Sequence, residues 1–388
     1  MKLVVISHKE CWEDPHSPSG YATVGGFPYQ MRAISELFDQ THILVPIFEP
    51  PKPAGVHPLV GHNLSIVPLD PPTGSGFRRK LSIVFWLFRN LPRIWRYVRA
   101  SDAVHIPIPG DIGTIGILVT LIQKKPLFVR HCGTWGNKDT LVSRFVSWLL
   151  PKIAGGSTVV MATGGGDRPP CPSNLAIEWI FSTTLSEQEI KFLPIASAWS
   201  KGEPLRLVTV SRITAEKNIQ STLHALVLVR QQYPQLRFDI VGGGDYLDTL
   251  KDLAVRLGLE DVVHFHGYVA HDRVIQILSQ SHLFVFPTRV REGFPKAVHE
   301  ALACGLPVIT SPVSVLPHLI GTQNGVVLAD TRPETIASEL LSLISDETRV
   351  QAMSRSARET SLQYTLDAWK TLIAQRLEVQ WGTLSLTP

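Results

Sequence analysis

Cysteine is scarce in this chain of 388 residues, and its four copies follow no regular spacing: Cys11, Cys132, Cys171 and Cys304. No C-x-x-C pair occurs, so the sequence predicts neither a disulfide framework nor a zinc site. Long apolar runs are also missing. The N-terminus lacks the apolar core of a secretory signal, and the most apolar segment, 112–122, is too short to span a bilayer. We therefore expect a cytoplasmic, globular protein.

The phosphate-binding motifs of common nucleotide enzymes are absent as well. After the first predicted strand, 2–7, the next glycine is Gly20, so no G-x-G-x-x-G follows that strand. In VGGGDYL (241–247), Leu247 stands where the last glycine of that motif would be. A Walker-type loop is not found either. These absences disfavour a nicotinamide dehydrogenase and a P-loop nucleotidase.

Acidic residues are missing from one stretch, although the net charge of the whole chain is only +4. Residues 77–99 contain no acid and seven basic side chains: Arg78, Arg79, Lys80, Arg89, Arg93, Arg96 and Arg99. Large apolar residues recur between them at helical spacing, and Pro92 predicts a kink or two helices. Such a segment is typical of contact with an anionic membrane surface, which we favour for 78–99. The alternative is a helix that packs internally with solvated arginines. Nothing else suggests nucleic acid.

What the chain does have is a regular alternation of short β-branched runs and helical patterns. This alternation predicts an α/β fold with two parallel, doubly wound sheets. The length favours two domains, with 195–204 as the hinge between them. The predicted strands are 2–7, 42–47, 65–69, 103–108, 126–131 and 157–162, followed by 205–210, 237–241, 262–267, 283–287, 307–310 and 325–328.

Polar and glycine-rich residues follow several strands of the second series. VSRITAEKN (210–218) places Arg212 and Lys217 in a loop that opens a helix, an arrangement suited to a diphosphate. Two solvated loop charges are the alternative. IVGGGD (240–245) allows close approach of a ligand at Gly243, or is a tight turn. FHGYV (265–269) is another strand end, with Tyr268 just after it.

The stretch REGFPKAVHEALACGLPVIT (291–310) predicts a loop, a helix and a strand. Pro295 suits the first turn of the helix, and Gly305 suits the position just past its end. Glu292 lies in the loop after a strand, and Glu300 follows eight positions later on the helix. Open α/β sheets bind ligands at the carboxyl ends of their strands, so both glutamates are candidate site residues.

These elements, in this order, resemble the retaining nucleotide-sugar glycosyltransferases of family four, the glycosyl transferases group 1 with an E-x7-E motif. The resemblance is nearly continuous from 205 to about 330 and looser over the first half. It implies the GT-B architecture, in which two Rossmann-like doubly wound domains face a cleft. The implied division is an acceptor-binding domain (1–195), a nucleotide-sugar-binding domain (196–365) and a C-terminal helix (366–388) that crosses back to the first domain.

The resemblance gives the two glutamates of the E-x7-E motif separate tasks. Glu300 would accept hydrogen bonds from the ribose hydroxyls, and Glu292 would contact the transferred sugar near its reacting face. Carboxylates are good acceptors for paired hydroxyls, and a helix N-terminus favours phosphate charge. Backbone N–H groups beside them would meet the sugar and the diphosphate. The implied donor-binding residues here are Gly293, Phe294, Pro295 and Lys296, together with Gly243 and Tyr268.

Arg212 and Lys217 match the basic pair that holds the diphosphate in that family. They would stabilise the charge that develops as the nucleoside diphosphate departs, and would replace a metal. The chain contains no D-x-D sequence, which agrees with an enzyme that needs no bound metal and no other cofactor.

In the first half, Gly25 and Gly26 fall in the loop after the first predicted strand and resemble the family's glycine-rich loop near the donor phosphates. A simple turn is the alternative. His131 directly follows a strand and resembles the catalytic histidine beside the donor sugar; a structural histidine is the alternative. One departure from the family is the segment 182–194, which lacks the usual Asn-Gly-Val-Asp turn.

The resemblance implies a retaining, metal-independent hexosyltransferase. Its acceptor would be lipid-linked or a growing polysaccharide or glycolipid, and the enzyme would be peripheral at the inner face of the cell membrane. A transferase with a soluble acceptor, a GT-B nucleotide-sugar epimerase and a non-catalytic sugar-nucleotide sensor remain open alternatives. The donor base and sugar, the acceptor and the linkage also remain open.

Overall fold

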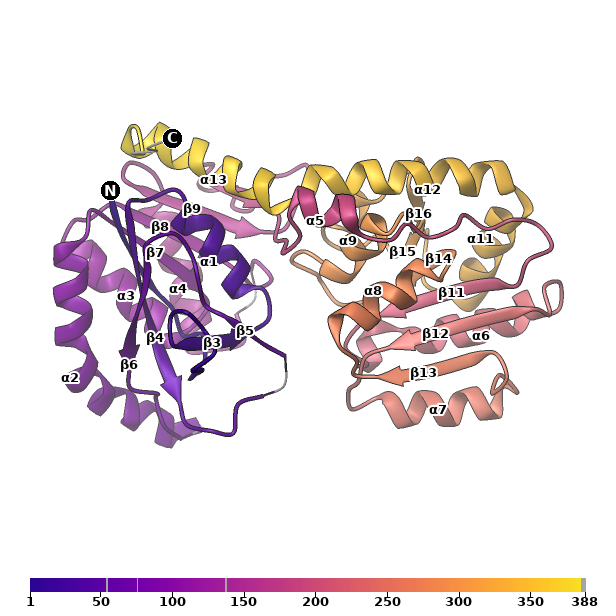
Figure 1. Cartoon of the computed structure of the whole chain (residues 1–388), viewed down its shortest axis with the longest axis horizontal. Coiled ribbons are helices and arrows are strands. Elements are labelled where there is room, and N and C mark those ends of the chain that lie inside the picture. The colour runs from indigo at the N-terminus through magenta and orange to yellow at the C-terminus, as the bar shows by residue number, and fades with distance from the viewer. Residues whose placement is uncertain (54, 75, 137, 385–388) are drawn as a thin grey trace. The chain divides into compact units, whose positions relative to one another are not determined.

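The computed structural model describes residues 1–53, 55–74, 76–136 and 138–384 (Figure 1). The side chains of Arg78, Arg79 and Lys80, part of the predicted basic segment, lie outside the described residues. Contacts within the chain divide it into two compact units. Unit 1 comprises Met1–Thr184 and the chain from Leu366 onward, and unit 2 comprises Leu185–Thr365.

Unit 1 is built on a 10-stranded sheet. Its parallel strands lie in the order β6-β4-β1-β7-β8-β9-β10, so the winding reverses between β1 and β7, as in doubly wound folds. Beyond the end of β4, the strands β2, β3 and β5 continue the sheet. The strands are β1 (Lys2–Ile6), β2 (Cys11–Glu13), β3 (Tyr21–Val24), β4 (Gln40–Phe48), β5 (Val56–Pro58), β6 (Leu64–Leu69), β7 (Ala103–Ile108), β8 (Leu127–His131), β9 (Thr158–Thr163) and β10 (Ile177–Ile180).

Helices cover both faces of this sheet, which is why β7 and β9 are buried along their whole length. Val4 points into a core shared with the helices α2, α3 and α4, whereas its neighbour Val5 points into a core shared with α1 and α13. The helices of unit 1 are α1 (Phe27–Ser35), α2 (Gly76–Ala100), α3 (Asp111–Ile122), α4 (Leu141–Ile153) and α13 (Leu366–Trp381).

The long helix α2 differs from its prediction in two respects. It continues through Pro92 as one helix, so of the two predicted outcomes, a kink or two helices, the second is wrong. Its predicted apolar stripe is also divided between two faces. Of its members, Val98 is buried against the sheet, whereas Phe85 and Phe88 are 72% and 78% exposed. The outer face of α2 is therefore aromatic as well as basic.

The last helix, α13, belongs to the core of unit 1. Trp369, Ile373 and Leu377 recur at four-residue spacing and are fully buried against α1 and β9. The indole ring of Trp369 lies under the guanidinium of Arg130, which is 5.1 Å from the ring centroid. Arg130, on β8, is itself buried and donates a hydrogen bond of 2.8 Å to the amide oxygen of Gln30.

Unit 2 contains a 6-stranded parallel sheet with the order β13-β12-β11-β14-β15-β16. This order reverses between β11 and β14, so the second sheet is also doubly wound. The predicted α/β class with two parallel sheets is thus confirmed. The strands are β11 (Leu205–Val210), β12 (Leu236–Val241), β13 (Val263–Gly267), β14 (Leu283–Phe286), β15 (Val308–Thr310) and β16 (Gly325–Val327).

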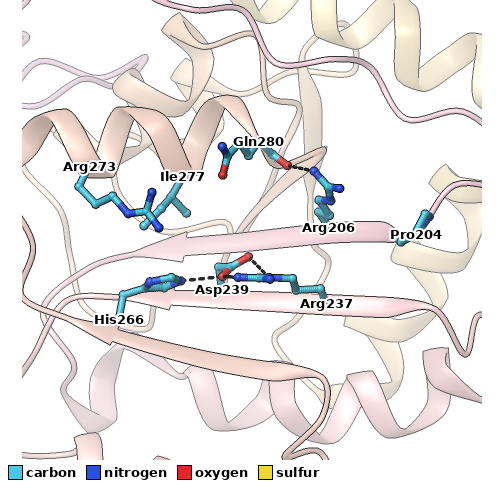
Figure 2. Close-up of a pocket in the computed structure, with 8 residues that line it drawn as sticks. All are labelled: Pro204, Arg206, Arg237, Asp239, His266, Arg273, Ile277 and Gln280. Atoms are coloured by element: carbon cyan, nitrogen blue, oxygen red, sulfur yellow. Dashed lines mark hydrogen bonds and ion pairs between the residues drawn. The ribbon is translucent and has the colours of Figure 1, made fainter.

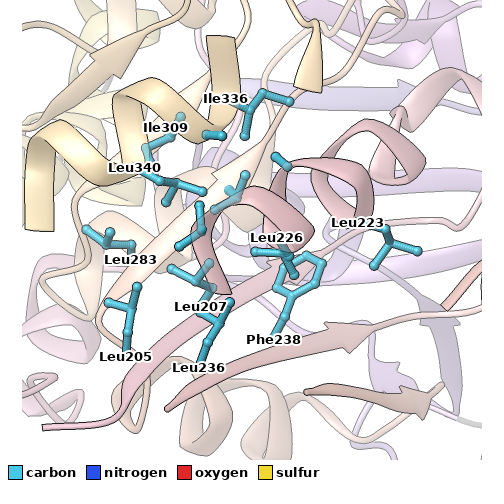
Figure 3. Packing of buried hydrophobic residues seen from close by; sticks show 14 of the residues in the cluster. Leu205, Leu207, Leu223, Leu226, Leu236, Phe238, Leu283, Ile309, Ile336 and Leu340 are labelled. Carbon is cyan, nitrogen blue, oxygen red and sulfur yellow. The ribbon is translucent and has the colours of Figure 1, made fainter. Parts of the chain in front are cut away.

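One face of this sheet packs against α6, α7 and α11, and Figure 3 shows part of that core. Alternate strand residues such as Leu207 and Phe238 point into it, and Leu226 and Leu340 cover them from the helices. The helices of unit 2 are α5 (Glu187–Phe192), α6 (Ile219–Arg230), α7 (Leu247–Arg256), α8 (His271–Ser279), α9 (Lys296–Ala303), α10 (Leu316–Leu319), α11 (Pro333–Ser345) and α12 (Glu347–Ser361).

The segment 195–204, predicted as a hinge, lies within unit 2 instead. Trp199 is fully buried in the core of that unit, and the backbone N–H of Ala196 donates to the carbonyl of Cys304 at 2.8 Å. The chain passes from unit 1 to unit 2 earlier, after Thr184, and α5 already belongs to unit 2. Within the described part of the chain, no helix is long and apolar enough to cross a membrane.

Candidate functional site

The carboxyl ends of four neighbouring strands in unit 2 carry many of the predicted donor residues. Arg212 follows β11, Gly243 follows β12, Tyr268 follows β13, and Glu292 lies in the loop after β14. Because parallel strands end at the same edge of a sheet, their loops are neighbours. A backbone hydrogen bond of 3.0 Å from Ile213 to Gly243 joins the first two loops directly. This edge is the candidate donor site.

Lys217 and Glu292 form an ion pair at this edge, although they are distant in the sequence. Their side chains are only 15% and 18% exposed. The ammonium group also lies 5.2 Å from the centroid of the Phe286 ring. Lys217 ends a short 3-10 helix, η1 (Ala215–Lys217), after which Asn218 adopts a left-handed conformation and leads into α6. The nearby Arg212 is exposed. The edge therefore has two cations, one of them held against a carboxylate.

The loop that carries Glu292 is tied down on both sides. The N–H of Arg289 donates to the carbonyl of Glu216, in η1, at 2.8 Å. The hydroxyl of Ser314 donates to the carbonyl of Glu292 at 2.6 Å. These bonds fix the backbone on either side of the ion pair, so the position of the carboxylate is set by the fold rather than by the pair alone.

The helix α9 begins one residue later than predicted. Pro295 is its N-cap rather than a residue of the first turn, and Lys296 is the first helical residue. Gly293 lies just before this turn and is partly exposed. Phe294 is buried and packs against the ring of Tyr364, with the centroids 5.6 Å apart. A contact between Phe294 and a ligand would thus come from its backbone. Gly305 follows the helix with φ of 80°, as expected for a C-terminal glycine.

Glu300, on α9, lies close to the start of α8. Its carboxylate accepts a hydrogen bond of 3.2 Å from Nε2 of His271, the first residue of α8. That hydrogen bond raises the pKa of His271 above its usual value, against the opposing effect of burial. Glu300 thus contacts a histidine that is half-exposed.

The glycines in the loop after β12 allow this loop to pack closely against the loops after β11 and β13. A Cβ atom on Gly243 would come within 2.4 Å of the Tyr268 ring, and one on Gly244 within 2.2 Å of the carbonyl oxygen of Ile213. The hydroxyl of Tyr268 donates to the carbonyl of Gly243 at 3.0 Å, while most of its ring is exposed. The structure therefore brings Gly243 and Tyr268 together, and side chains at these glycines would push the loops apart.

In unit 1, the glycine pair was predicted to lie in the loop after the first strand. The structure places it later in the chain. Strands β2 and β3 intervene, and Gly25 and Gly26 join β3 to α1. Gly25 has φ of 76°, which L side chains rarely adopt, and Gly26 is the N-cap of α1. The pair is therefore at a helix N-terminus, as a phosphate-binding loop would be, but the hairpin before it was missed.

His131 is the last residue of β8 and is largely buried. Burial lowers the pKa of His131, and its Nδ1 lies 3.1 Å from the carbonyl oxygen of Gly133. Its ring meets the ring of Trp135 edge-on, with the centroids 5.2 Å apart. A cavity of about 500 Å³ opens beside the histidine. A neutral imidazole at a cavity wall can accept or donate a hydrogen bond without carrying charge.

The same cavity contains residues that sequence reasoning missed, namely His8, Asp111 and Asp139. His8 follows β1, and its ring lies so close to Gly110 that a Cβ there would be 2.3 Å from Nδ1. Asp111 follows β7 at the start of α3. Both positions come just after strands of a parallel sheet, a signal that would have identified them. Asp139, in the loop before α4, had no such signal.

Across the residues described in the two units, no cluster of three or more His, Cys, Asp or Glu side chains is suited to a metal. All four cysteines are free thiols, and burial raises the pKa of Cys11 and of Cys304 to about 12. Neither of these two is therefore a thiolate nucleophile at neutral pH.

Part of the chain is similar to known proteins. Residues 195–360 match the family model described as glycosyl transferases group 1. The amylovoran biosynthesis glycosyltransferase AmsK of Erwinia amylovora is 30% identical over 162 residues, which is 40% of either chain. A GDP-mannose-dependent alpha-(1-6)-phosphatidylinositol monomannoside mannosyltransferase of Mycobacterium tuberculosis is 31% identical over 182 residues, 45% of this chain and 46% of the relative. The chain thus matches less than half the length of these relatives.

Solved structures resemble the chain over nearly its full length. HepE of Anabaena, solved in complex with UDP, covers 98% of this chain and 100% of its own, with a TM-score of 0.70 and 16% sequence identity. The two parallel sheets therefore have the GT-B fold, as expected, and the match to the glycosyl transferases group 1 model lies within unit 2.

Proposed function

We propose that this protein is a retaining glycosyltransferase that moves a sugar from a nucleotide-diphosphate donor to a hydroxyl of an acceptor. The observation that carries this proposal is the paired Lys217 and Glu292, beside Arg212, at the carboxyl edge of a glycosyl transferases group 1 domain. Diphosphates need fixed cations, and sugars need fixed acceptors for their hydroxyls. This edge offers both within one set of loops.

In this proposal the two cations act on the donor diphosphate. Negative charge grows on the leaving nucleoside diphosphate as its bond to the sugar breaks. Arg212 and Lys217 stabilise that charge, and thereby lower the barrier more than they tighten substrate binding. They take the place of a divalent ion, so we expect turnover to persist in EDTA. Retention would be established by the anomeric configuration of the product, measured by NMR.

The remaining donor contacts are proposed from the family resemblance. Glu292 contacts the transferred sugar, and Glu300 exchanges its hydrogen bond from His271 for bonds from the ribose hydroxyls. The backbone at the start of α9, residues 293–296, meets the sugar and the phosphates. Gly243 and Tyr268 complete the edge.

Unit 1 supplies the acceptor side in this proposal. As the resemblance implies, we assign to unit 1 a sugar contact at His131 and a phosphate contact at the backbone of Gly25 and Gly26. The cavity beside His131 offers the carboxylates of Asp111 and Asp139. Carboxylates near an imidazole and an indole suit the hydroxyls and apolar faces of a sugar, so we propose this cavity as the acceptor site.

The nucleotide site is tested by the thermal stability of the protein with UDP, GDP, ADP or dTDP, each without metal and with EDTA. A ligand at 100 times its Kd stabilises the fold by about 2.7 kcal/mol. We expect one clear responder, which identifies the donor base. If none of the four changes the melting temperature, the assignment of the donor edge is wrong.

The outer face of α2 points to an acceptor at a membrane surface. Phe85, Phe88 and Trp95 are exposed there beside the exposed arginines at 89, 96 and 99. A basic and aromatic helix face binds anionic lipid through both charge and apolar burial. We therefore propose that the protein works as a peripheral protein at the cytoplasmic membrane surface, on a lipid-linked acceptor or a growing polysaccharide or glycolipid.

Replacing Arg89, Arg96 and Arg99 together by glutamine is expected to weaken binding to vesicles that contain anionic lipid by about 100-fold. Each basic residue near such a surface contributes about 1 kcal/mol. The partition coefficient, measured by vesicle sedimentation, checks this result. The wild-type protein should lose at least this much affinity on vesicles without anionic lipid.

The matched control removes three exposed basic residues of unit 2, Lys201, Arg256 and Arg355, and should leave vesicle binding unchanged. Equal losses in both triple variants would mean that overall charge, and not α2, governs binding. No loss in either variant would support the soluble-acceptor alternative.

A further inference from the structure

On the face opposite to its main core, the sheet of unit 2 is apolar on one strand and polar on others. On the inner strand β14, this second face carries the buried side chains Phe284 and Phe286. On β12 and β13 it carries Arg237, Asp239 and His266 instead. A sheet face that packs only against helices is apolar. The polar strip on the outer strands therefore has another use.

A cavity of about 450 Å³ lies over this strip, between α8 and the strands β11, β12 and β13 (Figure 2). Arg206 and Arg237 border it from the sheet, and Arg273 borders it from α8, together with the apolar Ile277. Ligand pockets have volumes of roughly 300–1,000 Å³, so this cavity can accommodate a small molecule.

Only one of the three arginines at this cavity is balanced by a carboxylate. Arg237 donates two hydrogen bonds to Asp239, of 2.9 and 2.8 Å, and Nε2 of His266 lies 2.6 Å from the same carboxylate. Burial acts to raise the pKa of Asp239, but the hydrogen bonds from Arg237 and His266 outweigh it and lower that pKa. Asp239 is therefore ionised and already engaged.

The other two arginines contact neutral groups. Arg206 donates to the backbone carbonyl of Gln280 at 3.3 Å, and Arg273 donates to the side-chain oxygen of Gln276 at 2.6 Å. Neither forms an ion pair with a carboxylate within the described ranges of the chain. Two uncompensated positive charges thus border one cavity, and a guanidinium is well suited to phosphate because it donates hydrogen bonds in a planar fork.

We propose that this cavity binds a small molecule that carries a phosphate group, held by Arg206 and Arg273, with Arg237 positioned between them by Asp239. The site is separate from the proposed donor edge. Arg206 and Arg237 are the second residues of β11 and β12, about 13 Å of strand before the carboxyl ends. A dianionic phosphate would balance the two unpaired charges, and Ile277 would contact an apolar part of the ligand.

The test is a calorimetric titration of the full chain with inorganic phosphate and, separately, with glycerol 3-phosphate, both at constant ionic strength set with chloride. We expect saturable binding of one molecule per chain. Tighter binding of the ester would identify a phosphorylated metabolite as the ligand, and equal binding would identify free phosphate. Binding that does not saturate in the presence of chloride would overturn the proposal.

Variants locate the site. Arg206→Gln and Arg273→Gln should each weaken phosphate binding by at least about 10-fold, since a hydrogen bond to a charged group is worth that much. Both side chains are exposed, so the fold should tolerate the changes. Arg273→Lys, which keeps the charge, provides a milder variant if Arg273→Gln does not fold. Arg256→Gln, on the exposed part of α7, is the matched control and should bind phosphate normally.

A nucleotide titration separates this proposal from the proposed function. The Arg206→Gln and Arg273→Gln variants should keep the wild-type affinity for the nucleoside diphosphate that stabilises the protein. Unchanged phosphate affinity in both variants would refute the cavity as the site, whatever the nucleotide result. Loss of nucleotide affinity in both variants would place the two arginines in the donor site and would refute a separate anion site.

Discussion

Replacing Lys217 with alanine is expected to lower the rate of sugar transfer by about 100- to 1,000-fold. Losing one fixed group that stabilises transition-state charge has effects of this size. Lys217 is mostly buried and held against Glu292 and the ring of Phe286, so water would not replace its charge in the same place. Steady-state turnover with the donor identified by the nucleotide panel checks this result.

The affinity for the free nucleoside diphosphate distinguishes the proposed roles of Lys217 and Glu292. Lys217→Ala should raise its Kd by about 10-fold or more, because we propose that the lysine contacts the phosphates. Glu292→Gln should slow turnover but change this Kd little, because we propose that the glutamate contacts the sugar. Lys251→Ala, on the exposed surface of α7, is the control and should alter neither quantity. Wild-type turnover in the Lys217 variant would refute its catalytic role.

Replacing Trp369 with alanine is expected to destabilise unit 1 by about 3–5 kcal/mol, the usual cost of deleting a large buried aromatic side chain. Trp369 is fully buried, and its ring covers the guanidinium of Arg130. The variant would leave that charge beside a cavity. Hydrogen exchange of the β8 and β9 amides measures the loss of stability directly within unit 1.

Two further tryptophan variants serve as controls for this loss of stability. Trp369→Phe should cost much less, because it keeps most of the buried ring and removes an indole N–H that has no hydrogen-bond partner among the described residues. Trp148→Ala, on α4 of the same unit, should change stability by less than about 0.5 kcal/mol because that side chain is 56% exposed. Equal effects of Trp369→Ala and Trp148→Ala would show that α13 does not support unit 1.

Much of the fold could be predicted because its long parallel strands are buried on both faces. Segments such as 3–6 and 283–286 are continuous apolar runs, and this pattern alone identifies them. The strands β2, β3 and β5 are only three or four residues long, too short for any period to appear. Pro92 does not interrupt α2, which shows that tertiary packing can override a local preference.

The candidate site was predictable in its parts and not in its contacts. Strand ends place Arg212, Lys217 and Glu292 at one edge, because parallel strands share a direction. No local pattern shows that Lys217 and Glu292 form a pair, since that depends on how two loops are tied together. The cavity over β12 and β13 was missed for the same reason, because its arginines come from three separate elements.

The return of α13 to unit 1 affects the order in which the protein can be completed during synthesis. Unit 1 is discontinuous: its first segment ends at Thr184, and its last helix begins only at Leu366. A ribosome therefore finishes all of unit 2 before it releases Trp369, Ile373 and Leu377. Until then, the surfaces of α1 and β9 that these side chains cover are open to water or to a chaperone. Unit 1 is therefore the first unit to be synthesised and the last to be completed.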